Sequence, residues 1–374
     1  MKILVSGAGM AGLACGMDLT ETGHDVTVIE RAHHLRTNGS PVDIRGQALD
    51  VARDMGILQQ LDDNRVSTTD LSEFIDSAGG VIASVPLEEI NDSDADIEIA
   101  REDLARILHA GFEAHTPVVF GESIQTLHDD GTGVDVVLAS GKTDRFDLVV
   151  GADGMHSLTR RLTFGPEADY LEHLGFYVAL TDLPSARHET GANPFLNWPG
   201  HMIGIARYKD RALGVFNFRH DWIDYDYRDL DAQKRILLDA FKDHYEWRVP
   251  EILDAMTRDP ELYFDSVSQI HMDRWAKGRV VLLGDAAHCA SNLAGRGASL
   301  ALVGAWRLAQ ALREYPDDLG RAFESYEVLH RPAVDSAQAF ARVGGDLVMP
   351  ATQEALDLRN ARLRSIATDS EATG

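Results

Sequence analysis

The sequence predicts an α/β fold in which a Rossmann-like domain is interrupted by a sheet-rich insert. Strands followed by helices occupy both ends of the chain, whereas strand-like segments separated by Gly, Pro and Asn turns fill its middle. A chain of 374 residues also exceeds the usual length of one domain. We therefore expect two closely packed domains.

The first element is a βαβ unit. Residues 2–6 are apolar and predict a short buried strand, residues 10–22 predict a helix that ends at Gly23, and residues 25–30 predict a second strand. The elements expected further along the chain are helices at 47–55 and 102–114, a hairpin at 74–85, strands at 134–138, 147–150, 176–180, 202–208 and 212–218, a helix at 232–241, a strand at 280–283, and helices at 298–313, 322–341 and 354–364.

This order assigns the chain to two domains and a tail. We expect the Rossmann-like domain to contain residues 1–70, 95–165 and 278–345, and the sheet-rich, substrate-binding domain to contain residues 71–94 and 166–277. Residues 346–374 are expected to form a C-terminal covering helix and tail.

Composition excludes several classes of protein. The net charge of −25 disfavours nucleic acid and anionic lipid as partners. The two cysteines are too few for a disulfide framework, which fits a reducing, cytoplasmic setting, and no export signal or apolar membrane span is recognisable. The acidic run from Asp221 to Asp231 lacks the Gly and terminal Glu of an EF-hand loop, so no metal site is predicted.

A glycine motif joins the first strand to the first helix. Gly7, Gly9, Ala11 and Gly12 stand where backbone must approach a pyrophosphate at a helix N-terminus. Glu30 ends the second strand, where a carboxylate accepts hydrogen bonds from both hydroxyls of an adenosine ribose. A free 2′-hydroxyl indicates FAD or NAD rather than NADP.

Two later strand ends carry similar chemistry. Asp285 follows the strand at 280–283 and precedes Gly295, Gly297 and a helix, an arrangement that places an amide end beside a reduced isoalloxazine. Asp153 ends a third strand. The need for charge stabilisation favours non-covalent FAD over NAD, so we expect a Rossmann-like FAD-binding domain with an inserted sheet-rich substrate domain.

With these three ordered motifs, the chain resembles the class A flavoprotein monooxygenases, the aromatic hydroxylase group typified by para-hydroxybenzoate hydroxylase. It is similar in particular to members of like length such as the tetracycline-inactivating monooxygenase. The resemblance implies that Arg31 lies beside the adenine, that Asp43 lies near the flavin, and that Arg101 reaches the FAD. It also links Asp153 to both FAD and NAD(P)H, Asp285 to the pyrophosphate or ribityl chain, and Gly295 with Gly297 to the flavin-facing loop.

The implied activity is oxygenation of an electron-rich, aromatic or polyketide-like small molecule. NADPH or NADH, bound transiently, would reduce the flavin, and dioxygen would react through a C4a-hydroperoxide. Relatives carry prolines where this chain has Ser291-Asn292-Leu293, and Asp-Ala where it has Gly304-Ala305. A flavin-dependent reductase or dehydrogenase without oxygen insertion, and a catalytically silent FAD-binding protein, therefore stay open as alternatives. A monomer or a homodimer is expected.

Substrate contacts are expected from the inserted sheet, and Met202, Arg207 and Phe216 are the candidates. Alternating core residues would give the same pattern. No catalytic residue is assigned, because His288 and Cys289 are interpreted as packing residues. Met349-Pro350 either caps the substrate pocket or merely docks beside it.

Overall fold

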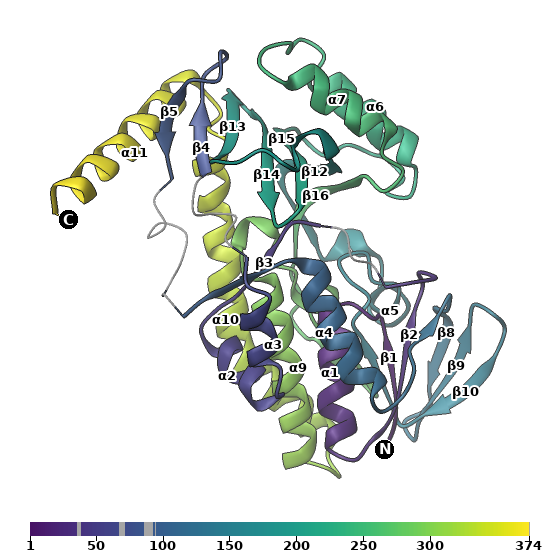
Figure 1. Cartoon of the computed structure of the whole chain (residues 1–374). Coiled ribbons are helices and arrows are strands. Elements are labelled where there is room, and N and C mark those ends of the chain that lie inside the picture. The colour runs from purple at the N-terminus through teal and green to yellow at the C-terminus, as the bar shows by residue number, and fades with distance from the viewer. Residues whose placement is uncertain (36–38, 67–71, 86–92, 94, 374) are drawn as a thin grey trace.

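The computed structural model describes residues 1–35, 39–66, 72–85, 93 and 95–373 (Figure 1). A six-stranded sheet lies at the centre of the Rossmann-like domain, with its strands in the order β17-β18-β11-β1-β2-β7. These strands are β17 (Ala276–Lys277), β18 (Val280–Leu282), β11 (Leu148–Gly151), β1 (Lys2–Ser6), β2 (Asp25–Glu30) and β7 (Val119–Phe120). All neighbours pair in parallel except β17 with β18.

Alternation along the strands explains the two layers that cover this sheet. Ile3 and Val5 of β1 pack in one core with the helices α1 (Met10–Glu21), α4 (Arg101–Glu113) and α9 (Gly297–Glu314), whereas Leu4 packs in a separate core. That second core is built with a three-stranded antiparallel sheet of β8 (Ile124–Asp129), β9 (Val134–Leu138) and β10 (Thr143–Phe146). Both faces of the parallel sheet are therefore buried.

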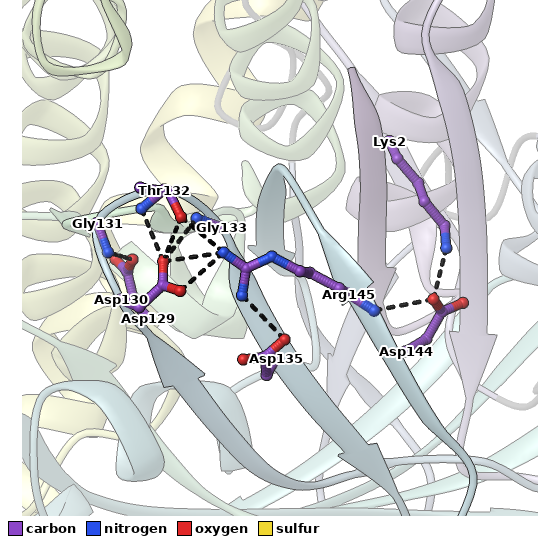
Figure 2. A network of polar contacts seen from close by, with 9 residues as sticks. All are labelled: Lys2, Asp129, Asp130, Gly131, Thr132, Gly133, Asp135, Asp144 and Arg145. Carbon is purple, nitrogen blue, oxygen red and sulfur yellow. Dashed lines mark hydrogen bonds and ion pairs between the residues drawn. The ribbon is translucent and has the colours of Figure 1, made fainter.

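A polar network fixes the small sheet at its β8–β9 turn (Figure 2). The Asp130 carboxylate accepts hydrogen bonds from the backbone and hydroxyl of Thr132, from the Gly133 amide and from the Arg145 guanidinium of β10. Hydrogen bonds from Thr132, followed by those from Arg145, lower the pKa of Asp130. Next to Arg145 in β10, the Asp144 carboxylate binds the Lys2 ammonium group of β1 at 2.6 Å. The network thus ties the small sheet to the large one.

The second domain is built on a seven-stranded sheet with the order β16-β12-β15-β14-β13-β4-β5. Its strands are β16 (Tyr263–Ile270), β12 (Leu171–Asp182), β15 (Arg211–Arg219), β14 (His201–Tyr208), β13 (Asn193–Trp198), β4 (Ser72–Ile75) and β5 (Val81–Ser84). Helices α6 (Leu230–Ala240) and α7 (Val249–Arg258) cover one face. The other face looks toward the Rossmann-like domain and the C-terminal helices, and we call it the inner face.

Strands β4 and β5 reach this sheet from the earlier part of the chain, as the sequence predicted for the 74–85 hairpin. The α/β class and the inserted sheet are confirmed. The remaining elements are the two-stranded sheet of β3 (Val42–Ile44) and β6 (Ile97–Ile99), and the short helices α2 (Gln47–Asp54), α3 (Leu58–Asp63), α5 (Leu158–Thr163) and α8 (Asp285–His288).

Two C-terminal helices link the domains. Helix α10 (Leu319–Val348) runs from the Rossmann-like domain up to the inner face, and α11 (Gln353–Thr373) lies beside β5 and β13 (Figure 1). The predicted boundary at 345/346 falls inside α10, because the helix continues to Val348. Among the described residues, no helix is long and apolar enough to span a membrane.

Candidate functional site

The site begins where three neighbouring parallel strands end. Strands β1, β11 and β18 lie side by side, so Gly7, Asp153 and Asp285 follow them at the same edge of the sheet. The contacts there are close. A Cβ atom on Gly7 would lie 2.4 Å from the Ala152 carbonyl oxygen, and one on Gly284 would lie 2.8 Å from the Ala11 Cβ. The three predicted motifs therefore meet in space.

The three glycines of the first loop are needed for different structural reasons. Gly7 has φ +109°, which is a glycine conformation, and a Cβ on Gly12 would lie 1.9 Å from the Gly7 carbonyl oxygen. Gly9 differs, because no atom lies within 4 Å of the position of its Cβ. This glycine leaves an open space directly at the N-terminus of α1, where phosphate oxygens are stabilised by backbone N–H groups.

Glu30 stands beside this opening. Its carboxylate accepts hydrogen bonds from the Ala8 amide at 3.0 Å and from the Ala32 amide at 2.8 Å. These contacts fix the carboxylate at the end of β2 while the side chain stays half-buried. One group therefore both orders the glycine loop and faces the cavity.

The opening belongs to a cavity of about 330 Å³ between the two domains. The predicted site residues among its lining are Gly7, Gly9, Glu30, Arg31, Arg101 and Asp153. From the second domain the lining includes Tyr227, Arg228 and Tyr263. Sequence reasoning missed these three, because nothing in their local sequence indicates that the sheet domain reaches over the glycine loop.

Asp285 lies deep in the protein, yet its side chain is exposed. The two facts fit a carboxyl group that faces an interdomain recess rather than packed atoms. Burial raises the pKa of Asp285, and the positive charge of Arg101 partly opposes this. Arg101 also acts on Tyr263, whose pKa burial raises. Arg101 therefore stands in electrostatic contact with residues of both domains.

The predicted flavin-facing loop lies beside Asp43. A Cβ on Gly295 would be 3.9 Å from the Asp43 carboxylate, and the Ser299 hydroxyl of α9 donates a 2.9 Å hydrogen bond to the Asp43 carbonyl oxygen. Asp43 also pairs with Arg45 at 2.9 Å. Burial raises the pKa of Asp43, although the charge of Arg45 opposes the shift. The structure thus brings Asp43 and Gly295 together, as expected, while Gly297 opens α9.

Asp153 is held by its own motif. Its carboxylate accepts hydrogen bonds from the Ser157 hydroxyl and from the amide and hydroxyl of Thr159, both at 2.9 Å. These bonds order the start of α5 at the wall of the cavity. Only the remaining surface of the carboxylate is left for a ligand.

His156 is a site residue that sequence reasoning missed. Its ring contacts Glu167 at 2.9 Å and Asp265 of β16 at 3.5 Å, and it stacks on Tyr227 with ring centroids 4.2 Å apart. Burial by itself lowers the pKa of His156, but the hydrogen bonds to Asp265 and Glu167 outweigh it and raise the pKa to about 10. A protonated imidazole, paired with these two carboxylates, therefore lies at the wall of the cavity. Its position after Asp153-Gly154 was the available signal.

The inner face of the sheet continues from the cavity. Tyr263, Leu180 and Val215 are consecutive neighbours across β16, β12 and β15, and Phe195 lies next beyond Gly204. All four are partly exposed, although Leu180, Val215 and Phe195 lie on interior strands of the sheet. We call these four residues the open row. Its first member, Tyr263, also lines the cavity, so the row extends the site across the sheet.

Two of the three predicted substrate contacts lie on the opposite face. Phe216 is fully buried against Phe241 of α6, and Arg207 pairs with Glu189 on the side covered by α7. Side chains alternate between the two faces along a strand, and the positions of Phe216 and Arg207 alternate with those of the inner-face residues. We therefore drop both from the substrate contacts. Met202 does lie on the inner face, in a cluster with Phe74 and Met349.

The structure shows what surrounds the residues at which this chain departs from the resembled family. Leu293 packs into the inner-face cluster, where relatives carry proline, and a Cβ on Gly304 would be 3.0 Å from the His330 ring. His288 is 2% exposed and packs on Trp275, and burial lowers its pKa to about 3. His288 and the buried Cys289 belong to the core, as the sequence interpretation held.

The donor set fits FAD. The half-buried Glu30 carboxylate, the open position at Gly9 and the exposed Asp285 carboxylate lie in this order along the strand ends, which suits a ribose, a pyrophosphate and a ribityl chain. Among the described residues, no group of side chains could hold a metal ion.

Comparisons with known proteins agree with this geometry. The model of the FAD binding domain family matches residues 1–187 and 239–332. A flavin-dependent monooxygenase of Legionella longbeachae is 35% identical over 91% of this chain and 87% of its own length, and FAD-dependent monooxygenase asL6 of Sarocladium schorii is 32% identical over 92% and 87%.

Among solved structures, tetracycline destructase Tet(51) superposes with a TM-score of 0.86 at 34% identity, covering 97% of this chain and 95% of that one. Klebsiella pneumoniae HpxO, solved with FAD and uric acid, shares the fold with a TM-score of 0.75 at 21% identity. The chain belongs to the FAD-dependent monooxygenase family and carries its FAD-binding domain.

Proposed function

We propose that this protein uses NADPH or NADH and dioxygen to oxygenate an electron-rich ring compound of aromatic or polyketide type, which binds on the inner face. The observation that carries the proposal is the continuity of the cavity with the open row through Tyr263. Tet(51) is named for its action on tetracycline, which supports a multi-ring substrate. Bound FAD supplies the redox chemistry that activates dioxygen.

The chain's own residues bind and orient. In this proposal Gly7, Gly9, Ala11 and Gly12 surround the pyrophosphate, Glu30 accepts from the adenosine ribose, and Arg31 lies beside the adenine. Asp285 accepts hydrogen bonds from the ribityl side, and Arg101 compensates negative charge near it. Asp43, Gly295 and Gly297 bound the reactive end. The buried inner-face cluster around Met202 and Met349 excludes water there.

The nicotinamide donor is proposed to bind transiently at the rim of the same cavity. Arg31, Arg161 and Arg228 are exposed in its lining. Three exposed arginines around one opening stand out in a chain with a net charge of −25. They favour the phosphates of NAD(P)H over the neutral substrate at this rim. Asp153 belongs to the same wall.

The test is an oxygen-coupling experiment. FAD-loaded enzyme is mixed with NADPH or NADH and ring compounds under ¹⁸O₂, and NAD(P)H oxidation is compared with labelled product. We expect a substrate to accelerate NAD(P)H oxidation and one labelled oxygen atom to enter the product. Equal oxidation without label would establish the reductase alternative, and negligible oxidation with every compound would establish the silent flavoprotein.

A further inference from the structure

One polar side chain stands within the apolar inner face, next to the open row. Asn217 lies on β15, two residues after Val215, and its flanking residues Phe216 and Phe218 both belong to the core under α6 and α7. The Asn217 side chain therefore points to the inner face. Its direct neighbours there are Val178 of β12 and Met202 of β14.

The Asn217 side chain is largely enclosed, and its amide has no hydrogen-bond partner in the described part of the chain. The residue is 5% exposed, and its neighbours Val178 and Met202 are each 6% exposed. No hydrogen bond joins the Asn217 side chain to any residue within the described part of the chain. The polar atoms of Asn217 are not fully enclosed and keep some contact with solvent, whereas a position serving packing alone would favour an apolar residue of similar size.

Two other asparagines of the same sheet behave differently. Asn193 accepts a hydrogen bond from the Arg207 amide at 2.9 Å, and Asn197 donates to the Val348 carbonyl oxygen at 3.2 Å. The fold therefore satisfies buried amides where they serve structure. Asn217 is the contrasting case, because its amide adjoins the open row with no partner from the described part of the chain.

The charges on β15 restrict what Asn217 can recognise. Arg211 and Arg219 lie on the same face at the two ends of the strand, and each is paired, Arg211 with Glu102 at 2.6 Å and Arg219 with Asp346. The Arg219 guanidinium also donates to the Met349 carbonyl oxygen and lies over the Phe176 ring. The nearest carboxylate along the sheet row is Asp265, beyond Val178. A carboxylate group of a ligand would gain little here.

We propose that Asn217 is a specificity-determining residue that binds the substrate through a neutral group able both to donate and to accept a hydrogen bond, such as an enolised β-diketone or a primary carboxamide. This inference rests on the proposed function. An asparagine side chain offers two N–H donors and one carbonyl acceptor, so it pairs with such a group through two bonds. The apolar ring system of the ligand then lies along the open row.

The experiment compares Asn217→Leu with wild type and with the control Asn193→Leu, all loaded with FAD. Three probes are titrated by the change in flavin absorbance: a polycyclic enolised β-diketone, a polycyclic carboxamide and 4-hydroxybenzoate as the carboxylate. Thermal midpoints are measured without probe. We expect Asn217→Leu to weaken the two neutral probes at least tenfold, with FAD content unchanged and a thermal midpoint equal to or above that of wild type.

The control separates binding from folding. Asn193→Leu removes a satisfied amide, so its thermal midpoint is expected to fall while its probe affinities stay at the wild-type values. Wild-type affinity in Asn217→Leu, a fall in its thermal midpoint together with its affinity, or tighter binding of 4-hydroxybenzoate than of both neutral probes would each overturn the role of Asn217. If wild type binds none of the probes and oxidises NAD(P)H with none, the proposed function fails as well.

Discussion

Glu30 gives the sharpest quantitative prediction, because its carboxylate has two roles in the structure. Replacing it by Ala removes the hydrogen bonds to the Ala8 and Ala32 amides and the proposed contact to the adenosine ribose. Ala8 is 4% exposed, so water cannot readily replace its lost partner. Hydrogen bonds to a charged group contribute about 1.5–3 kcal/mol, which corresponds to a loss of FAD affinity of roughly 10- to 150-fold.

The assay is flavin release after dialysis, followed by titration with FAD and measurement of its fluorescence. Glu30→Gln should fall between wild type and Glu30→Ala, because the amide oxygen can still accept one of the two bonds. Asp25→Ala serves as the control, since Asp25 is an exposed acid at the other end of the same strand. Glu30→Ala with the FAD affinity of wild type would refute the assignment of Glu30 to the ribose.

Three further predictions concern the same cavity. Gly9→Ala should lose FAD while keeping its thermal midpoint, because its Cβ enters open space. Gly12→Ala should lower the thermal midpoint, because its Cβ meets the Gly7 carbonyl oxygen. Equal thermal midpoints of the two variants would contradict this. Asp285→Ala should impair flavin retention or anaerobic reduction of the flavin by NAD(P)H. Asp224→Ala, at an exposed position, should have a free energy of unfolding within about 0.5 kcal/mol of wild type and keep its flavin. Loss of flavin in Asp224→Ala but not in Asp285→Ala would show that the FAD cleft lies on another part of the chain. The pKa of His156 is raised from 6.5 to about 10, so its stabilising effect is complete below pH 6.5 and is lost as the pH rises to 10. The free energy of unfolding should therefore fall more over this range in wild type than in His156→Gln. Denaturant titrations at each pH would measure this difference.

The parts of the fold predicted best from sequence are those with local signals. Apolar runs and glycines, which can be identified directly in the sequence, predict the strand, the glycine loop and the helix at residues 2–21. The meeting of Gly7 with Asp285 followed from the rule that parallel strands end at one edge.

The parts that were not predicted depend on residues distant in sequence. Alternation groups Phe216 with Phe218, but only α6 and α7 decide that this face is the covered one. Likewise, the sequence predicted a helix that ends at residue 341, yet α10 continues to Val348 and packs so closely on Phe176 that a Cβ on Gly345 would lie 2.7 Å from its ring. The charge on His156 comes from Glu167 and Asp265, which no local pattern connects to it.

The central claim is that one FAD lies without a covalent bond along the edge formed by the glycine loop, Glu30 and Asp285. The most direct measurement is the ratio of flavin to protein in the purified chain, before and after adding FAD, with the flavin then released by denaturation. The account predicts one FAD per chain, released completely into the supernatant. A colourless protein that acquires no flavin spectrum when FAD is added would contradict it.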